Sequence, residues 1–330
     1  MESIFGNSNS EEIISKKIRH IANIEFKPLF IERYSKLTDW EKFREYSLRY
    51  LRRSIRVNTL KIGIRELYER LTKDWVLQPI PWCKEGFWIE HRHSERRDIG
   101  NLVEHVLGYI YLQEAVSMIP PLVLNPKPGE VILDLCAAPG SKSTQIAALI
   151  KNKGILVVND INRLRLKPLT LNLQRVGATC SIITMMQGQF LKQKNQYDRV
   201  LIDAPCSGTG TIRKSLKTIK IWNPGMVKRL SKQQKQLIAV GFEALKPGGV
   251  LVYSTCTLEP EENEEVVDFL LNKYPNAKVE PVELNIKRSP AVLEFEGKSY
   301  NKEISKALRL WPQDNDTEGF FVCRIRKTIS

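Results

Sequence analysis

From residue 131 onward, short apolar runs alternate with longer segments whose apolar residues recur at helical spacing. The apolar runs lie at residues 131–136, 155–159, 181–185, 199–203 and 250–254, and the helical segments at residues 143–150, 163–176, 227–245 and 261–271. This alternation predicts a doubly wound parallel sheet, that is, an α/β fold. Another strand, at residues 320–325, follows a long irregular stretch, so we expect it to close the sheet in the antiparallel direction.

The first 120 residues have a different pattern. Helical spacing at residues 12–50, with Thr38 and Asp39 at the start of a second helix, precedes strands at 55–60 and 86–90 and a short helix at 65–71. A turn-rich segment at residues 125–129 separates this part from the sheet. We therefore predict a small α+β region at residues 1–120 and a Rossmann-like domain at residues 121–330.

Three predicted strands end in residues that can carry out chemistry. The first strand ends in the small-residue turn at residues 136–142, the fourth in Asp203-Ala204-Pro205-Cys206, and the fifth in Ser254-Thr255-Cys256. Open α/β sheets bind ligands at the carboxyl ends of their strands. We expect both thiols and the Asp203 carboxylate to face one crevice.

The turn at residues 136–142 has the composition of a nucleotide-type site. Its small residues let backbone approach a ligand, the helix that follows offers free N–H groups, and Lys142 adds a charge. Neither the dinucleotide pattern nor a P-loop is present. Asp160 ends the second strand, where an acid can accept hydrogen bonds from ribose hydroxyls; the alternative for Asp160 is a helix N-cap.

Cysteine usage and hydropathy narrow the class of protein. The six cysteines lack Cys-x-x-Cys spacing, which argues against disulfides or a zinc ribbon, and Cys83, Cys180 and Cys323 are expected in the core. A metal site from Cys136, Cys206 and Cys256 is disfavoured because no histidine follows residue 107. The sequence contains no run of about 18 apolar residues and no secretory signal at its start. We expect a cytoplasmic protein without metal and without membrane contact.

Positive charge is concentrated around the first cysteine motif. The net charge is +14, and residues 192–235 contain 11 Lys or Arg against two acids. This favours a nucleic-acid partner over a merely solvated surface. Trp222 is expected to pack rather than stack on a base. Two further basic clusters either hold phosphates or are solvated: residues 49, 52, 53 and 56, and residues 91, 92, 93, 96 and 97.

Several ordered motifs together resemble one enzyme family. The segments DLCAAPGSKST, NLQRVGA, DAPCSGTGTIRK and LKPGGVLVYSTCTLEPEENEEVV are similar to those of RNA (cytosine-5) methyltransferases related to the bacterial ribosomal Sun/Fmu enzyme, including transfer-RNA-type members. The resemblance begins near residue 54 and covers roughly three quarters of the chain. It implies a class I methyltransferase sheet that binds S-adenosyl-L-methionine.

The resemblance also implies roles for particular residues. Cys256 is the nucleophile that adds to cytosine C6, Cys206 assists product release, and Asp203 hydrogen-bonds the cytosine edge. The family usually has Asp where this chain has Gln187, a neutral acceptor for adenine. The implied cofactor-binding residues are Cys136, Ala137, Ala138, Pro139, Gly140, Ser141, Lys142, Asp160, Arg165, Gln187 and Asp203.

The predicted function is therefore an RNA cytosine-5 methyltransferase with an amino-terminal RNA-binding region. Transfer RNA is preferred over ribosomal RNA because the chain is compact and lacks long appended arms, and we expect a monomer. A DNA cytosine methyltransferase, whose nucleophile is the Pro-Cys cysteine, and a non-catalytic RNA-binding assembly factor are the alternatives. The acids at 259, 261, 262, 264 and 265 are expected to favour a helix start rather than to catalyse.

Overall fold

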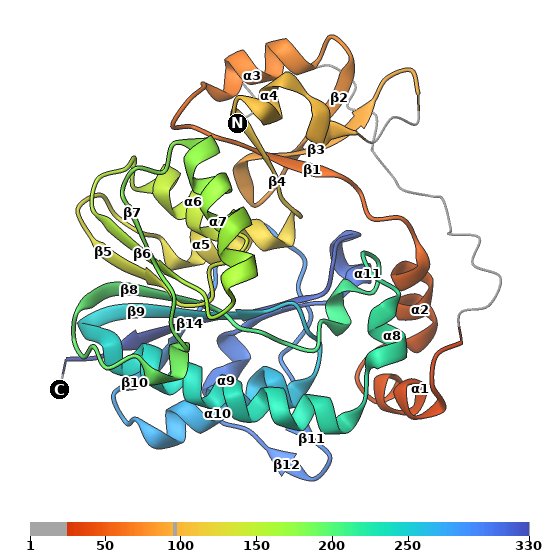
Figure 1. The fold of residues 1–330 in the computed structure, drawn as a ribbon. Coiled ribbons are helices and arrows are strands. Elements are labelled where there is room, and N and C mark those ends of the chain that lie inside the picture. The colour runs from red at the N-terminus through yellow and green to blue at the C-terminus, as the bar shows by residue number, and fades with distance from the viewer. Residues whose placement is uncertain (1–24, 95–97, 330) are drawn as a thin grey trace.

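The computed structural model describes residues 25–94 and 98–329, which form a large and a smaller sheet surrounded by helices (Figure 1). The large sheet has the strand order β10-β14-β9-β8-β5-β6-β7. Strands β5 to β9 pair in parallel, whereas β14 runs antiparallel between β9 and β10. The predicted doubly wound sheet and its antiparallel closing strand are confirmed. The strands on this path are β5 (Val131–Asp134), β6 (Ile155–Asn159), β7 (Ser181–Thr184), β8 (Tyr197–Asp203), β9 (Leu245–Thr255), β10 (Ala277–Glu280) and β14 (Phe320–Lys327), and β13 (Leu308–Leu310) also pairs with β14.

Helices cover both faces of this sheet (Figure 1). Successive side chains of a strand point to opposite faces, and the two cores follow this rule. Ile132 of β5 packs in the core beneath one group of helices, and the next residue, Leu133, packs in the core of the other face. The first group is α5 (Ile119–Leu124), α6 (Ser141–Leu149) and α7 (Arg163–Val176); the second is α9 (Pro224–Ala244) and α10 (Glu264–Lys273).

Most predicted elements of this domain are present, with their ends moved by a few residues. The largest change is in β9, which was expected at residues 250–254 and begins at Leu245. The helix expected to begin at residue 227 begins at Pro224, because the Asn223 side chain accepts a hydrogen bond from the Met226 amide at 2.9 Å and caps it.

The smaller sheet has the order β2-β3-β1-β4, all antiparallel where paired. The strand expected at residues 55–60 ends at Val57, and that expected at 86–90 is part of a longer strand. Two strands were missed: one contains Pro79, and the other has only three residues. The elements are β1 (Ser54–Val57), α3 (Ile64–Leu71), β2 (Trp75–Ile80), β3 (Cys83–His91), α4 (Val103–Val106) and β4 (Ile110–Leu112).

Two helices precede this sheet, α1 (Pro28–Ser35) and α2 (Trp40–Leu48). The predicted start of the second helix is confirmed, because the Asp39 side chain accepts from the Lys42 amide at 3.2 Å. The part of the predicted helical region at residues 12–24 lies outside the described residues. The irregular stretch before β14 holds β11 (Glu294–Phe295), β12 (Lys298–Ser299), β13 (Leu308–Leu310) and α11 (Pro312–Asn315), and α8 (Lys217–Ile221) precedes α9.

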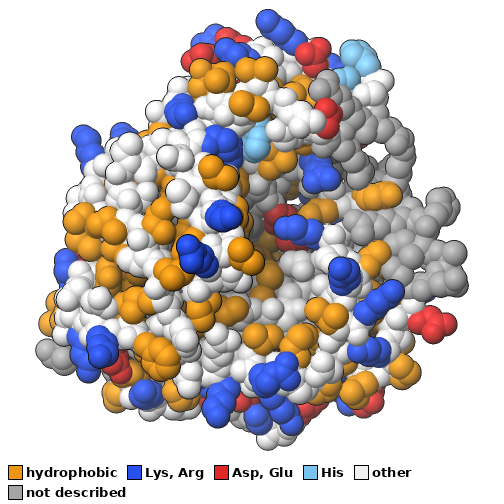
Figure 2. Space-filling model, in the orientation of Figure 1, with side chains coloured by type: hydrophobic (Ala, Val, Ile, Leu, Met, Phe, Trp, Pro, Cys, Tyr) orange, Lys and Arg blue, Asp and Glu red, His pale blue; other side chains and the backbone are white. Residues whose placement is uncertain are grey.

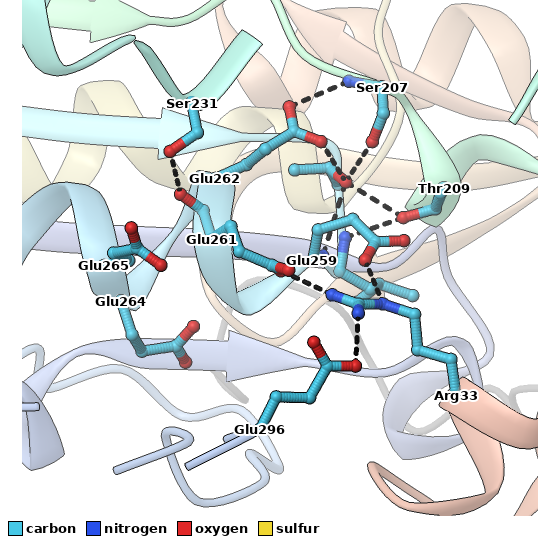
Figure 3. A network of polar contacts seen from close by, with 12 residues as sticks. Arg33, Ser207, Thr209, Ser231, Glu259, Glu261, Glu262, Glu264, Glu265 and Glu296 are labelled. Carbon is cyan, nitrogen blue, oxygen red and sulfur yellow. Dashed lines mark hydrogen bonds and ion pairs between the residues drawn. The ribbon is translucent and has the colours of Figure 1, made fainter. Parts of the chain in front are cut away.

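Helix α1 is fastened to the loop after β9 by a buried arginine (Figure 3). Arg33 Nε lies 2.8 Å from Glu259, Nη2 lies 2.5 Å from Glu261, and Nη1 lies 2.9 Å from Glu296. The Arg33 side chain is 8% exposed and Glu259 is fully buried. The amino-terminal helix thus neutralises acids of the sheet domain.

Replacing Arg33 with Ala should therefore destabilise the protein strongly. The Glu259 carboxylate would lose its cation inside the core, which costs about 3–5 kcal/mol. Urea denaturation measures the free energy of unfolding. Lys36→Ala is the matched control, since Lys36 pairs with Glu32 on the exposed side of the same helix and should cost at most about 0.5 kcal/mol. Equal effects of the two substitutions would contradict a fastening role for Arg33.

Candidate active site

Two cysteines that are fifty positions apart in the chain touch in the fold. Cys206 follows β8 and Cys256 follows β9, and their Sγ atoms lie 3.2 Å apart without a disulfide. The parallel pairing of β8 with β9 sets Asp203 beside Ser254, so both loops leave the sheet at the same edge. This distance confirms that the two thiols converge, while the crevice they were expected to face stays a prediction.

Close backbone contacts hold the two loops together. The Ala204 amide donates to the Ser254 carbonyl at 2.9 Å, and the Gly210 amide donates to the Cys256 carbonyl at 3.0 Å. A Cβ at Gly210 would lie 2.2 Å from the Gly319 carbonyl oxygen, so only glycine fits there. The separation of the thiols is therefore set by the backbone of both loops.

The surroundings of Cys206 disfavour its thiolate form. The hydrogen bond with Cys256 and burial are the main causes that raise the pKa of the Cys206 thiol well above its usual value. The negative charges of Glu262 and Asp203 act in the same direction. Cys206 is therefore held as a neutral thiol at physiological pH.

A charged pair lies at the same strand end. Lys142 Nζ donates to Asp203 Oδ2 at 2.6 Å and to Ser117 Oγ at 3.1 Å, and Ser254 Oγ donates to Asp203 Oδ1 at 2.9 Å. Lys142 Nζ also lies 5.5 Å from the centre of the Phe320 ring. The sequence placed the charge of Lys142 at the cofactor, but in the structure its ammonium group is bonded to the predicted cytosine-binding carboxylate.

Ser117, Ser254 and Phe320 were not predicted as site residues. Ser254 stands two residues before Cys256, and Phe320 begins the closing strand. A search for polar residues next to the cysteine motifs finds Ser254. The other two reach the site only through the fold, because β14 pairs with β9 and the residues before α5 pack over the start of α6.

The turn between β5 and α6 fits the backbone-lined site that its composition predicted. Gly140 has φ +101°, which favours glycine, and a Cβ there would lie 2.9 Å from Leu169 Cδ1. α6 begins directly after it at Ser141, so its first N–H groups point toward the turn. The residues present are thus compatible with a cofactor that carries a carboxylate.

Two predicted cofactor-binding residues, Asp160 and Arg165, contact this turn. Asp160 Oδ2 accepts from the Ala138 amide at 3.3 Å, and its Oδ1 accepts from the Asn162 amide at 2.9 Å. Arg165 donates to the Ala138 carbonyl at 2.5 Å and lies 3.4 Å from Asp160. The N-cap of α7 is Asn162, so the alternative role of Asp160 as that cap is wrong. Its contact with ribose stays a prediction.

Gln187 follows β7, next to the strand that ends before Asp160. Its side chain is exposed and its Oε1 accepts from Gln189 Nε2 at 2.9 Å. Gly188 is tightly packed, since a Cβ there would lie 2.9 Å from Leu237 Cδ2. The segment is thus fixed at the same edge of the sheet as the turn, while the adenine contact of Gln187 stays a prediction.

The acids after Cys256 lie at helix starts as expected, with Glu264 and Glu265 in the first turn of α10, but some of them also bind distant partners. Glu259 binds Arg33, Tyr34 and Trp222, and Glu264 forms a fully buried ion pair with Arg309 at 2.6 Å. Sequence reasoning missed these roles because the partners lie far away in the chain. Trp222 is 1% exposed, which confirms packing rather than base stacking.

Part of the predicted basic surface is also buried. Arg56 is 2% exposed and donates to Gln113, Thr144 and the Ser141 carbonyl, and Arg52 binds the Asn315 carbonyl and Asp316. Arg213 is buried and pairs with Asp316 at 2.7 Å. For these arginines, the predictions of phosphate binding and of solvation are both wrong, because protein groups bind them. Exposed cations remain at positions 214, 217, 220, 228, 229 and 232.

The three cysteines predicted to lie in the core are wholly or partly buried there. Cys83 and Cys323 are buried as predicted, and Cys180 packs partly buried against the core. Within residues 25–94 and 98–329, no group of three or more His, Cys, Asp or Glu is arranged to hold a metal ion. No helix in that part of the chain is long and apolar enough to cross a bilayer.

Comparisons with protein families and solved structures show which family this chain belongs to. Residues 121–326 match the model for 16S rRNA methyltransferase RsmB/F, and residues 26–115 match the model for the N-terminal domain of 16S rRNA methyltransferase RsmF. A crystal structure of a methyltransferase homolog protein from Pyrococcus horikoshii aligns with a TM-score of 0.81 and 37% identity, over 92% of this chain and 95% of that one.

Two named relatives differ in how much of their length is matched. The tRNA (cytosine(49)-C(5))-methyltransferase of Pyrococcus abyssi is 51% identical over 308 residues, which are 92% of this chain and 98% of that protein. Ribosomal RNA small subunit methyltransferase F of Shewanella oneidensis is 44% identical over 88% of this chain, which spans only 60% of that relative. The chain belongs to the RsmB/F methyltransferase family, the RNA (cytosine-5) methyltransferases that its motifs resemble.

Proposed function

We propose that this protein transfers a methyl group from S-adenosyl-L-methionine to C5 of cytosine in RNA, with transfer RNA as its substrate, through a covalent adduct between Cys256 and cytosine C6. The observation that carries the proposal is the contact of two thiols, 3.2 Å apart, beside the Asp203 carboxylate at the carboxyl edge of the sheet. Residues 1–120 would serve as the RNA-binding region and residues 121–330 as the methyltransferase domain.

The cofactor site would consist of residues 136–142, Asp160, Arg165, Gln187 and Asp203. When bound, the cofactor supplies an electrophilic methyl group on a sulfonium centre. Gly140 lets the backbone approach it, and the first N–H groups of α6 favour its carboxylate. Asp160 and Arg165 brace the turn through the Ala138 backbone.

Cytosine C5 is a weak nucleophile, so the protein must activate it. Addition of the Cys256 thiolate to C6 forms an S–C6 bond and moves the C5–C6 electron pair into the ring, where N3 takes up a proton. Asp203, which is held by Lys142 and Ser254, would hydrogen-bond the N3 edge. C5 then takes the methyl group and loses its proton to a base. The S–C6 bond breaks to release the Cys256 thiolate, and N3 gives up the proton that it had taken.

The environment of Cys206 supports a role in product release. The high pKa of Cys206 suits a group that exchanges a proton during release rather than one that attacks as a thiolate. The nucleophile of the resembled family matches Cys256. The target base has to leave its stack for either sulfur to reach C6.

Surface charge and sequence similarity support the choice of RNA. Figure 2 shows Lys and Arg side chains on both sides of a hollow near the centre of one face. The relative that acts on cytosine 49 of tRNA matches almost over its full length, whereas the ribosomal relative is matched over 60%. Ribosomal RNA is the second candidate, because the family models carry that name.

The first test separates the two cysteines. Cys256→Ala should abolish methylation but keep cofactor binding, because it removes only the nucleophile. Cys206→Ala should accumulate a covalent RNA adduct, because release is slowed. Denaturing gel electrophoresis after incubation with transfer RNA shows whether each variant forms the covalent adduct. An adduct in Cys256→Ala but not in Cys206→Ala would reverse the assignment toward the DNA-enzyme mechanism.

A second test concerns the exposed lysines after Cys206. If Lys214 and Lys217 contact phosphates, converting both to Gln should weaken RNA binding and flatten the slope of log affinity against log salt by roughly two contacts. The control converts Lys151 and Lys153 to Gln, since both are exposed at the opposite edge of the sheet, before β6. Fluorescence anisotropy measures both slopes; an unchanged slope in the first pair would assign those lysines to solvation.

A third test concerns the neutral residue at position 187. Gln187→Asp should restore a charge-assisted hydrogen bond to the adenine amino group and tighten cofactor binding by about 1 kcal/mol, which is several-fold. Calorimetry measures this affinity. Gln189→Asp adds the same charge two residues away and should have a smaller effect. Weaker binding by Gln187→Asp would show that another group contacts adenine.

A further inference from the structure

One buried carboxylate connects the loops of both cysteines. Glu262 is fully buried, and its Oε2 accepts from the Ser207 amide at 3.0 Å and from Gln234 Nε2 at 2.8 Å. Ser207 directly follows Cys206 in the chain. Figure 3 shows Glu262 pointing toward Ser207, away from the acids that face Arg33.

The same residue also contacts the second loop. Its Oε1 accepts from Thr257 Oγ1 at 3.5 Å, and Thr257 directly follows Cys256. The hydroxyls of Ser207 and Thr257 lie 2.7 Å apart, and Tyr253 Oη donates to the Glu262 carbonyl at 2.6 Å. A single carboxylate thus contacts the residue after each thiol.

We propose that Glu262 is a positioning residue that holds the two cysteine loops together and sets a carboxylate against the Cys206 loop, so that Cys256 alone attacks cytosine. Two thiols at contact distance otherwise compete for C6. The naming of Cys256 as nucleophile rests on the proposed function; the effect of Glu262 on Cys206 does not.

The electrostatic surroundings support this division of roles. Burial raises the pKa of Glu262 to about 7, and the nearby charge of Glu259 acts in the same direction. The Glu262 charge in turn raises the pKa of the Cys206 thiol and of the Tyr253 hydroxyl. Asp203 adds to the effect on Cys206 from the other side. As pH rises through about 7, Glu262 becomes charged, and ionisation of Cys206 becomes less favourable.

The test measures the Cys206 thiol directly, without RNA. In a Cys256→Ala background, the rate of iodoacetamide modification of Cys206 is followed against pH by peptide mass spectrometry, which separates it from the other cysteines. Glu262→Gln keeps the shape and can still accept from Ser207 and Gln234, but removes the charge. It should lower the pKa of Cys206 and speed its modification several-fold at pH 8, because the reactive form is the thiolate.

Glu265→Gln is the matched control. Glu265 belongs to the same acidic segment, but it pairs with Lys235 and Lys298 at 2.8 and 2.9 Å. Its substitution should leave the modification profile of Cys206 unchanged. Cofactor affinity, measured by calorimetry, verifies that each variant is folded.

A second variant separates position from charge. Thr257→Val removes the hydroxyl between Ser207 and Glu262 but keeps the carboxylate. It should leave the pKa of Cys206 high, while the otherwise unchanged enzyme forms the RNA adduct several-fold more slowly. This variant tests the contact between the two cysteine loops even if Glu262→Gln does not fold.

The outcomes distinguish this inference from the proposed function. Covalent RNA adduct in the Cys256→Ala, Glu262→Gln double variant, with none in Cys256→Ala alone, would support the inference. An unchanged Cys206 profile in Glu262→Gln, or normal adduct formation in Thr257→Val, would overturn it. If Cys256→Ala still abolishes methylation and Cys206→Ala still traps an adduct, the proposed function stands regardless.

Discussion

The pairing of β8 with β9 is the interaction on which the active site depends. Their parallel register sets Asp203 beside Ser254, and the chain turns away from the sheet at the same level after each strand. Two loops that are fifty residues apart in sequence therefore meet, and the Ala204 and Gly210 amides fasten one to the other. A shift of one residue in this register would turn one set of side chains to the other face of the sheet. The contact between the thiols is thus a property of the sheet.

Behind these loops lies an unusual amount of buried charge. Arg33 and Arg309 each neutralise acids of the segment that follows Cys256. A buried ion pair adds little net stability, yet removing one partner is costly. The pairs therefore act mainly as constraints on position. Because Arg33 belongs to α1 and Arg309 to β13, the loop of Cys256 is held from two distant parts of the chain.

The sequence predicted what depends on local pattern and missed what depends on distant partners. Apolar runs identified the parallel strands, since buried strands carry their signal in their own residues. The short β4 and the Pro-containing β2 lack such a signal. Glu259 was interpreted as part of a helix start because its neighbours are acidic, while its partners, Arg33 and Trp222, lie 226 and 37 positions away. The positions of Cys206 and Cys256 were predictable because Cys206 stands three residues after β8 and Cys256 directly after β9.

The first turn of α6 connects three parts of the molecule: the turn proposed to hold the cofactor, the cysteine loops and the amino-terminal sheet. Its amino end forms the cofactor turn, where Gly140 allows close approach. Lys142, one residue into the helix, reaches Asp203 at the cysteine loops. Arg56 of the amino-terminal sheet donates to the Ser141 carbonyl and to Thr144 of the same turn. A displacement of the amino-terminal sheet would therefore act on the turn proposed to hold the cofactor and, through Lys142, on Asp203. Under the proposed function, RNA held by the amino-terminal region would thereby be kept in fixed register with the methyl donor and with Asp203.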